Sequence, residues 1–490
     1  MNAGLHNSAF SLKAQAGYVF IGKSLAYVAQ LLLIMVLVRL LERAQFGIYR
    51  EALLVAVFFN PILSLGFPQG LYYFFPNAKG KVQQLLFQTQ VFLVITSLLG
   101  LFLLIGLKDE IAGLFPHTDL VPLMIPIALY TAFLNTSCML DHIFILERKP
   151  ALELAYSVSE KIVQVFFVLA AFFLFRSIYH LVWSMALFAM AKTATVLLYL
   201  FARYGIPKSI RGLRKSYFYH QMRYSIPLGL AKSVGDIGRK VDQYMAGVFL
   251  GPADFALYSV VRLHLPLVEV FYQSVGGVAL PRISQYAAAK SPEGARLLWH
   301  KTIVAYASLT IPVVGFLCVM AEPIMVVAFT SDYMKSAGIL RMILPVLLVQ
   351  MLSYGTIPRA YESTSYILLS NVITFIVGIT LGYFMISRYR ITGAALCYVI
   401  AFTLNAVVQL VKAKSILRVG ISDWLPWKPL LNLTGWTALA MSFPAGLRLL
   451  HLPDLGLLIA GSIGYVAFVA LLLRKNQYLS FRMIIQEMKG

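Results

Sequence analysis

The chain has 490 residues, of which 60% are hydrophobic and 12% charged, and it carries a formal net charge of +21. Soluble domains have about a quarter charged residues, so this composition excludes an ordinary soluble domain. Apolar stretches close to the ~20 residues that cross a bilayer as a helix recur along the whole length. The sequence therefore predicts an all-α polytopic membrane protein.

Fourteen membrane-spanning helices are expected from the apolar stretches. They are placed at 15–41, 46–74, 82–107, 120–146, 151–175, 180–203, 224–250, 253–280, 297–321, 336–360, 364–387, 391–413, 429–449 and 454–473. The longest polar connections are expected at 204–223 and 281–296. Pro61 and Pro68, beside Gly66 and Gly70, are expected to interrupt the second span, and Pro227, Pro266, Pro312 and Pro345 to interrupt others.

A high net positive charge is also typical of nucleic-acid-binding proteins, but the basic residues are distributed differently here. Most Lys and Arg residues outside the spans fall in connections on one predicted side, together with both termini. This asymmetry is the positive-inside bias of membrane proteins. It predicts a multi-pass protein of the cell (inner or plasma) membrane with both termini cytoplasmic, and no nucleic-acid partner.

A short repeat organises the chain. Leu41-x-x-Ala44-Gln45-Phe46-Gly47-Ile48-Tyr49 returns as Leu250-x-x-Ala253-Asp254-Phe255-Ala256-Leu257-Tyr258, each between long apolar runs. Repeated multi-helix lobes in a hydrophobic protein are typical of transporters, with the substrate path where the lobes meet.

The predicted organisation is two pseudo-symmetric six-helix lobes followed by two further helices. The parts are a cytoplasmic lead (1–14), an N-lobe (15–203), a basic inter-lobe cytoplasmic linker (204–223), a C-lobe (224–413), two appended spans (414–473) and a cytoplasmic tail (474–490). The basic stretch 208–215 of the linker either lies on anionic lipid of the cytoplasmic leaflet or simply obeys the charge rule of inside loops.

Several basic residues fall inside predicted spans, where each costs about 2.5–3.5 kcal/mol at a helix centre. In the seventh span, one helical face is expected to carry Lys232, Asp236, Arg239, Lys240 and Gln243. This stripe is typical of a helix that lines a watery path. The alternative is a ladder of Lys232–Asp236–Lys240 ion pairs that only supports packing.

These basic residues predict a cationic cavity for an anionic ligand, because Lys and Arg bind phosphate through charge-assisted hydrogen bonds. The candidate substrate-binding residues are Lys23, Arg50, Lys192, Lys232, Arg239, Lys240 and Arg262. Since the surroundings are apolar, an amphipathic lipid-linked substrate fits better than a free ion. Its diphosphate would lie among the basic groups and its tail in the bilayer.

The sequence contains no catalytic constellation: the histidines are scattered, without metalloprotease or nucleotide-binding spacing. A non-enzymatic function without cofactor or metal is therefore expected, driven by an ion gradient, the membrane potential or the substrate itself. Candidates for Na⁺ or H⁺ coupling are Asp141, Glu160, Asp242 and Glu269. A structural ion pair is the competing interpretation for each of them.

The chain resembles the polysaccharide-exporting branch of the MOP (multidrug/oligosaccharidyl-lipid/polysaccharide) superfamily, in particular the Wzx-type O-antigen and oligosaccharide flippases. The resemblance covers most of the chain and rests on the order and spacing of five segments. They are Arg39-Leu40-Leu41 to Phe46-Gly47-Ile48-Tyr49, the Gly66 turn, Asp242-Gln243-Tyr244-Met245, Leu250-Gly251 to Phe255-Ala256-Leu257-Tyr258, and Gly393-Ala394-Ala395.

The resemblance implies a two-lobe, V-shaped MATE-like fold with a central cationic cavity that works by alternating access. It implies movement of polyprenyl-diphosphate-linked oligosaccharide from the cytoplasmic to the outer leaflet, for O-antigen, capsule or exopolysaccharide biosynthesis. The expected partners are the lipid-linked oligosaccharide and membrane lipids, with a polysaccharide polymerase and a chain-length regulator as further candidates.

Three alternatives stay open on the sequence. A lipid II flippase for peptidoglycan shares the fourteen-span plan and a basic cavity. A multidrug antiporter of the same superfamily fits less well, because acidic cavity groups suit cationic drugs. From a different class, a membrane polysaccharide polymerase or ligase would be expected to have a large outer loop, whereas the predicted outer loops are short.

Overall fold

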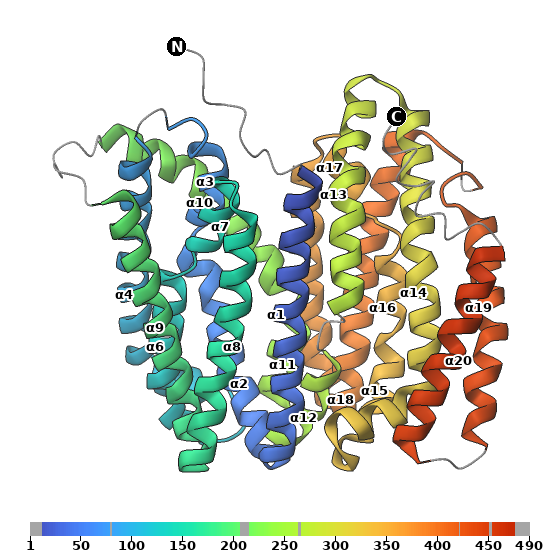
Figure 1. The fold of residues 1–490 in the computed structure, drawn as a ribbon, viewed down its shortest axis with the longest axis horizontal. Helices are drawn as coiled ribbons and strands as arrows, with labels where there is room; N and C mark the ends of the chain where they lie inside the picture. The colour runs from blue at the N-terminus through green and yellow to red at the C-terminus, as the bar shows by residue number, and fades with distance from the viewer. Residues whose placement is uncertain are drawn as a thin grey trace. The chain divides into compact units, whose positions relative to one another are not determined.

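The computed structural model describes residues 12–78, 81–205, 215–262, 266–420, 422–449 and 453–475, which consist of helices and short connections without a β-strand (Figure 1). Within these ranges, eight helices are long and apolar enough to cross a membrane. The predicted all-α polytopic class is confirmed. Most of the predicted lead, part of the basic linker and most of the tail lie outside the described residues.

The chain divides into two compact units. Unit 1 comprises 1–37 and 44–237, and unit 2 comprises 38–43 and 238–490. The division therefore falls inside the predicted seventh span, between Ile237 and Gly238.

Unit 1 is built from the helices between the N-terminus and the seventh predicted span. They are α1 (Leu12–Leu40, whose last residues belong to unit 2), α2 (Arg43–Ser64), α3 (Phe67–Phe74), α4 (Val82–Gly106), α5 (Lys108–Ala112), η1 (Val121–Leu123), α6 (Met124–Thr136), α7 (Leu140–Leu146), α8 (Pro150–Phe175), α9 (Ile178–Tyr204) and α10 (Lys215–Gly238). α6 packs against both α4 and α9, and α8 packs against α9. Buried polar side chains join these helices: Asn135 donates to Ser97 Oγ at 2.9 Å.

The second span breaks between α2 and α3, as its proline and glycine residues predict. Leu65 and Gly66 both have positive φ, at 43° and 71°. Gly229 of α10 crosses this break so closely that a Cβ atom on it would lie 2.1 Å from the backbone carbonyl carbon of Leu65. Ser225 and Ser233, four residues away on either side, extend the small-residue face of α10. Close backbone approach through small residues is a common way for membrane helices to pack.

Unit 2 contains the remaining helices. They are α11 (Val241–Phe249), α12 (Pro252–Val261), α13 (Pro266–Ala288), α14 (Pro292–Phe329), η3 (Ser331–Tyr333), α15 (Ser336–Ile343), α16 (Pro345–Gln350), α17 (Thr356–Ala360), α18 (Thr364–Leu417), α19 (Trp427–Arg448) and α20 (Asp454–Lys475). α18 joins two predicted spans across a non-helical residue, Arg390, with φ 54° and ψ −128°. The two C-terminal helices pack on each other and on α14.

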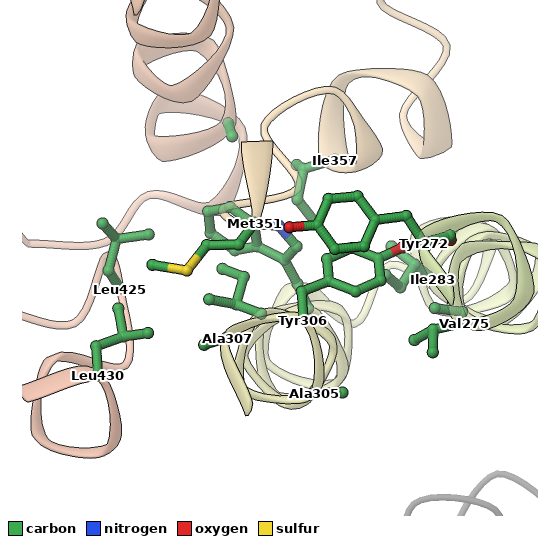
Figure 2. Packing of buried hydrophobic residues seen from close by; sticks show 14 of the residues in the cluster. Tyr272, Val275, Ile283, Ala305, Tyr306, Ala307, Met351, Ile357, Leu425 and Leu430 are labelled. Atoms are coloured by element: carbon green, nitrogen blue, oxygen red, sulfur yellow. Dashed lines mark hydrogen bonds between the residues drawn. The ribbon is translucent and has the colours of Figure 1, made fainter. Parts of the chain in front are cut away.

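A buried aromatic cluster holds α13 and α14 together in unit 2. Figure 2 shows Tyr272 and Tyr306 with their rings side by side, surrounded by aliphatic residues such as Ile283, Met351 and Ile357. The ring centroids are 4.2 Å apart. Tyr306 donates a hydrogen bond to the carbonyl oxygen of Tyr272 at 2.9 Å, so its hydroxyl is satisfied inside the apolar core.

The sequence repeat occupies equivalent local structures in the two units. α1 is followed by a short connection and α2, and α11 by a short connection and α12. The repeated aromatic residues Phe46, Tyr49, Phe255 and Tyr258 are all among the largest fully buried side chains. The repeat therefore marks the start of a packed helix in each unit.

Two expectations about continuity are wrong. The seventh span is not one helix, because α10 ends at Gly238 and α11 starts at Val241. The predicted polar stripe from Lys232 to Gln243 is therefore split between two helices of different units. The predicted polar connection 281–296 is mostly helical, since α13 continues to Ala288 and α14 begins at Pro292.

Candidate functional site

Unit 1 contains a cluster of charged side chains on membrane helices, centred on α8 and α9. Lys192 of α9 lies with its Nζ 3.0 Å from Glu160 Oε2, and both side chains are largely buried. Lys161 Nζ is 3.9 Å from the other oxygen of Glu160. The Lys192 ammonium also lies 5.7 Å from the centre of the Tyr156 ring. The predicted binding residue Lys192 and the predicted coupling residue Glu160 thus form one ion pair.

Asp141 and Lys23 belong to the same cluster. Asp141 of α7 interacts electrostatically with Lys192, Glu160 and Lys23. Lys23 of α1 also interacts with Glu153 of α8, which is almost fully buried. Among the described residues, no carboxylate lies within salt-bridge distance of Lys23, and the buried Oδ1 atom of Asp141 has no hydrogen-bond partner. The Lys23 ammonium and the Oδ1 atom of Asp141 are therefore available to a further hydrogen-bond partner.

Arg50 and Glu51 of α2 form a second polar group in unit 1. Glu51 is fully buried and lies 2.7 Å from Nε2 of His117, which comes from the connection between α5 and η1. The other ring nitrogen of His117 is 3.6 Å from Asp119. Arg50 is partly buried, and in the described part of the chain it has no acidic side chain within 4.0 Å. The role of His117 was missed because it is distant from Glu51 in sequence.

Lys232 is paired within its own helix. Its Nζ lies 2.6 Å from Asp236 Oδ2 at the i, i+4 spacing that the sequence suggests for an ion-pair ladder. Lys232 remains about half exposed, and it interacts electrostatically with His142 of α7. Lys232 and the cluster around Lys192 both belong to unit 1.

Arg262 and Asp242 form a buried ion pair in unit 2, at the point where α12 ends and α11 begins. Arg262 Nε lies 2.7 Å from Asp242 Oδ2, and Nη2 lies 3.2 Å from Oδ1. The guanidinium lies 3.5 Å from the centre of the Tyr398 ring. Tyr258, from the sequence repeat, donates its hydroxyl hydrogen to Asp242. Asp242 is thus held in an ion pair, the arrangement that the competing interpretation of this residue expects.

Arg262 also stabilises the break between α10 and α11. Its Nη2 donates to the carbonyl oxygen of Arg239 at 3.2 Å. A broken membrane helix leaves backbone groups without intrahelical partners, and these groups need another one. Arg239 is exposed at this break, and Lys240 is the N-terminal capping residue of α11. Glu269, in the first turn of α13, is partly buried and accepts a hydrogen bond from Gln273 at 3.1 Å.

The candidate residues are divided between the two units. Unit 1 holds Lys23, Arg50, Asp141, Glu160, Lys192 and Lys232, and unit 2 holds Arg239, Lys240, Asp242, Arg262 and Glu269. Each set contains both basic and acidic side chains. Among the candidate cations of unit 1 in the described ranges, Lys23 and Arg50 have no carboxylate within salt-bridge distance, whereas Lys192 and Lys232 each have one. Groups of this kind can donate hydrogen bonds to an anionic ligand. No cluster of three metal-ligating side chains occurs in the described part of the chain.

The long apolar helices and the charged side chains within them are those of a multi-pass membrane protein. The profile of the family described as "Polysaccharide biosynthesis protein" matches residues 12–287, and that described as "Lipid II flippase MurJ" matches residues 153–461. Each match covers more than half of the chain. The chain belongs to the polysaccharide biosynthesis protein family of MOP flippases, and is a transporter rather than an enzyme.

Individual relatives are distant. The "Probable low-salt glycan biosynthesis flippase Agl15" of Haloferax volcanii is 20% identical over 214 residues, which cover 42% of this chain and 45% of that protein. The chain thus spans less than half the length of this curated relative. A structure of lipid II flippase MurJ in an inward closed conformation matches with a TM-score of 0.69 and 15% identity, over 94% of this chain and 99% of that one.

More distant members of the superfamily share the fold. A MOP superfamily transporter from Pyrococcus furiosus matches with a TM-score of 0.58 and 12% identity, over 83% of this chain and 96% of its own. An inward-facing multidrug resistance MATE family transporter has the same TM-score and identity, with 82% and 93% covered. These similarities confirm the predicted MATE-like fold.

Proposed function

We propose that this protein moves a polyprenyl-diphosphate-linked oligosaccharide from the cytoplasmic to the outer leaflet of the cell membrane, for surface polysaccharide biosynthesis. The membership of the polysaccharide biosynthesis family supports a lipid-linked glycan as cargo. The observation that carries the proposal is the presence of Lys23 and Arg50 on apolar membrane helices without salt-bridge partners among the described residues. Maintaining such cations in a membrane is costly, so they are usually functional.

The proposed mechanism is alternating access, with basic groups of the membrane helices neutralising the diphosphate while the polyprenyl chain stays in lipid. Lys192, Lys232 and Arg262 each have an acidic partner. A bound diphosphate would have to compete with these carboxylates. Lys23 and Arg50 need no such exchange, so they are proposed as the first contacts of the diphosphate. Arg239 and Lys240 are also proposed to bind the cargo.

Coupling to H⁺ or Na⁺ is proposed through Asp141, because its buried Oδ1 atom lacks a hydrogen-bond partner in the described part of the chain. Glu160 and Asp242 already neutralise Lys192 and Arg262. Glu269 accepts a hydrogen bond from Gln273, so it is a weaker candidate. Transport by an Asp141→Asn variant that responds normally to both ion gradients would exclude Asp141 as the coupling group.

A gene deletion followed by analysis of lipid-linked sugars in each leaflet tests the proposed cargo. We expect a complete lipid-linked oligosaccharide to accumulate facing the cytoplasm, where external glycan-labelling reagents cannot reach it. Normal exposure of this intermediate at the outer surface would contradict the proposal. Co-purification from the same strain tests the further proposal that a polysaccharide polymerase and a chain-length regulator associate with the flippase.

The second candidate function is transport of lipid II for peptidoglycan. It is supported by the match of the MurJ family profile to residues 153–461 and by the shared fold. Depletion of the protein separates the two functions. Cell lysis with accumulation of lipid II would favour the lipid II flippase, whereas viable cells without surface polysaccharide would favour the first proposal.

A further inference from the structure

An apolar groove of about 280 Å³ runs along unit 1 between α4 and α9. Its walls include Val91 and Ile95 from α4, and Leu197 and Phe201 from α9. Both helices are long and apolar enough to cross a membrane. Val91, Ile95 and Phe201 are exposed by 40–50%. The groove is therefore an open channel for hydrocarbon rather than a closed cavity, and none of the charged residues proposed to bind cargo lines it.

The groove has the length of one bilayer leaflet. On α4 it extends from Gln83 to Ile95, which at 1.5 Å per residue is about 18 Å. Half of a hydrocarbon core of about 30 Å is about 15 Å. On α9 the lining ends at Tyr204 and Gly205, close to Gln83. The groove thus begins where both helices reach one membrane surface, and it ends near the middle of the bilayer.

Basic side chains surround the surface end of the groove. Tyr204 lines the groove and donates a hydrogen bond to Glu147 at 2.6 Å. Glu147 also lies 2.7 Å from Lys149 Nζ and 3.5 Å from Arg203 Nε. Lys81, an exposed residue, stands two positions before Gln83 at the start of α4. Two basic residues thus contact one carboxylate, and Lys81 adds a third positive charge at the start of α4, so the local charge is positive.

We propose that this groove binds one acyl chain of an anionic glycerophospholipid, whose phosphate group contacts Lys81, Lys149 and Arg203. The groove length suits an acyl chain confined to one leaflet, and its carbon walls suit hydrocarbon. The basic surface end favours an anionic head group over a zwitterionic one, through charge-assisted hydrogen bonds. This lipid site is separate from the charge cluster proposed to bind the cargo, and it makes the stability of unit 1 depend on the lipid composition.

Native mass spectrometry of the full-length protein with phosphatidylglycerol or phosphatidylcholine of identical acyl chains tests the site. We expect selective retention of phosphatidylglycerol, and at least a fivefold loss of that retention in a Val91→Trp variant, whose side chain fills the groove. The matched control is Leu99→Trp, which changes an exposed residue of the same helix outside the groove and should retain the lipid. A Lys81→Gln/Arg203→Gln variant should lose the selectivity for phosphatidylglycerol, while Lys149 still neutralises Glu147.

A photoreactive phosphatidylglycerol with its label on the acyl chain provides a test on the unaltered protein, which does not depend on the folding of any variant. Cross-links should map to 83–95 and 197–205. Equal retention of the two lipids, equal binding by the two tryptophan variants, or cross-links spread evenly over the membrane helices would each overturn the proposal. Displacement of phosphatidylglycerol by an equimolar polyprenyl phosphate would also overturn it, since the groove would then belong to the cargo tail.

Discussion

Individual charged side chains inside this protein differ in whether an opposite charge neutralises them. Arg262 and Asp242 are nearly inaccessible and hydrogen-bond each other through two atoms of the guanidinium. Burying two charges costs several kcal/mol each, which their attraction repays only in good geometry. Lys23 and Arg50 have no such partner among the described residues. The Arg262–Asp242 ion pair therefore stabilises the structure, whereas Lys23 and Arg50 are each available to a ligand.

Removing one member of the buried pair should destabilise unit 2. Asp242→Ala leaves the Arg262 guanidinium buried without a counter-charge, which typically costs about 3–5 kcal/mol. For a unit of this size, the thermal unfolding midpoint should fall by roughly 10 °C. A matched Asp242→Leu/Arg262→Met variant removes both charges and should remain close to the wild type. Equal midpoints for Asp242→Ala and the wild type in detergent would contradict the structural role.

The His117–Glu51 pair predicts a pH dependence of stability. Burial lowers the pKa of His117, and the nearby Asp119 carboxylate opposes this effect only in part. The unfolded chain therefore binds a proton at His117 more readily than the folded chain. Stability is complete above the ordinary histidine pKa of about 6.5 and falls below it, by up to about 1.4 kcal/mol per pH unit.

A His117→Gln variant keeps an N–H donor for Glu51 but cannot titrate. Its thermal unfolding midpoint should change less between pH 7.5 and pH 5.5 than that of the wild type. His117→Ala leaves the Glu51 carboxylate buried without its partner, so it should be less stable at every pH. Identical pH profiles for the wild type and His117→Gln would show that His117 does not titrate in this way.

Two helix interruptions in this protein are each contacted by a side chain from another helix or from its end. The break at Leu65–Gly66 lies against Gly229 of α10, and Ser233 donates to the carbonyl oxygen of Pro61 at 2.8 Å. The break at Arg239–Lys240 is stabilised by Arg262. At each interruption, a side chain from elsewhere in the chain thus donates a hydrogen bond to a backbone carbonyl oxygen near the break.

Gly229→Ala should therefore be strongly destabilising, although alanine normally favours a helix. The new Cβ would lie 2.1 Å from the carbonyl carbon of Leu65, which belongs to the backbone and cannot move away cheaply. Overpacking of this kind costs about 1–3 kcal/mol, and more when backbone must shift. Gly435→Ala in α19 is the control, because no atom lies within 4 Å of its added Cβ. A similar yield of monodisperse protein from both variants would contradict the close crossing.

The sequence predicted the general architecture because its signals are local. Apolar runs predicted the all-α membrane class, and the repeat at Phe46–Tyr49 and Phe255–Tyr258 lies at the start of a packed helix in each unit. The break at Arg239–Lys240 was missed, because the i, i+4 spacing from Lys232 to Asp236 also fits an unbroken helix. At this break Arg262 donates a hydrogen bond to the carbonyl oxygen of Arg239, and Glu51 is paired with His117. Such contacts between distant residues have no signature in a single sequence.

The whole molecule combines costly intramembrane cations with the fold of a MOP flippase, so charge removal should abolish transport and spare assembly. Arg50→Gln and Lys23→Gln should each reduce surface polysaccharide by at least tenfold at normal membrane levels of the protein. Arg296→Gln is the matched control, since it removes a charge from a surface pair with Glu293, where the expected cost is about 0–1 kcal/mol. Full export by both Lys23 and Arg50 variants would exclude these residues from cargo binding.

Flipping of the lipid-linked oligosaccharide by the purified protein tests the central proposal most directly. The native lipid-linked oligosaccharide, labelled on its glycan, is placed in proteoliposomes, and its accessibility to a membrane-impermeant quencher is followed with time. We predict that the wild-type protein makes the inner-leaflet label accessible, while Arg50→Gln and protein-free liposomes do not. Equal rates in all three preparations would contradict the assignment of this chain as a flippase for lipid-linked oligosaccharide.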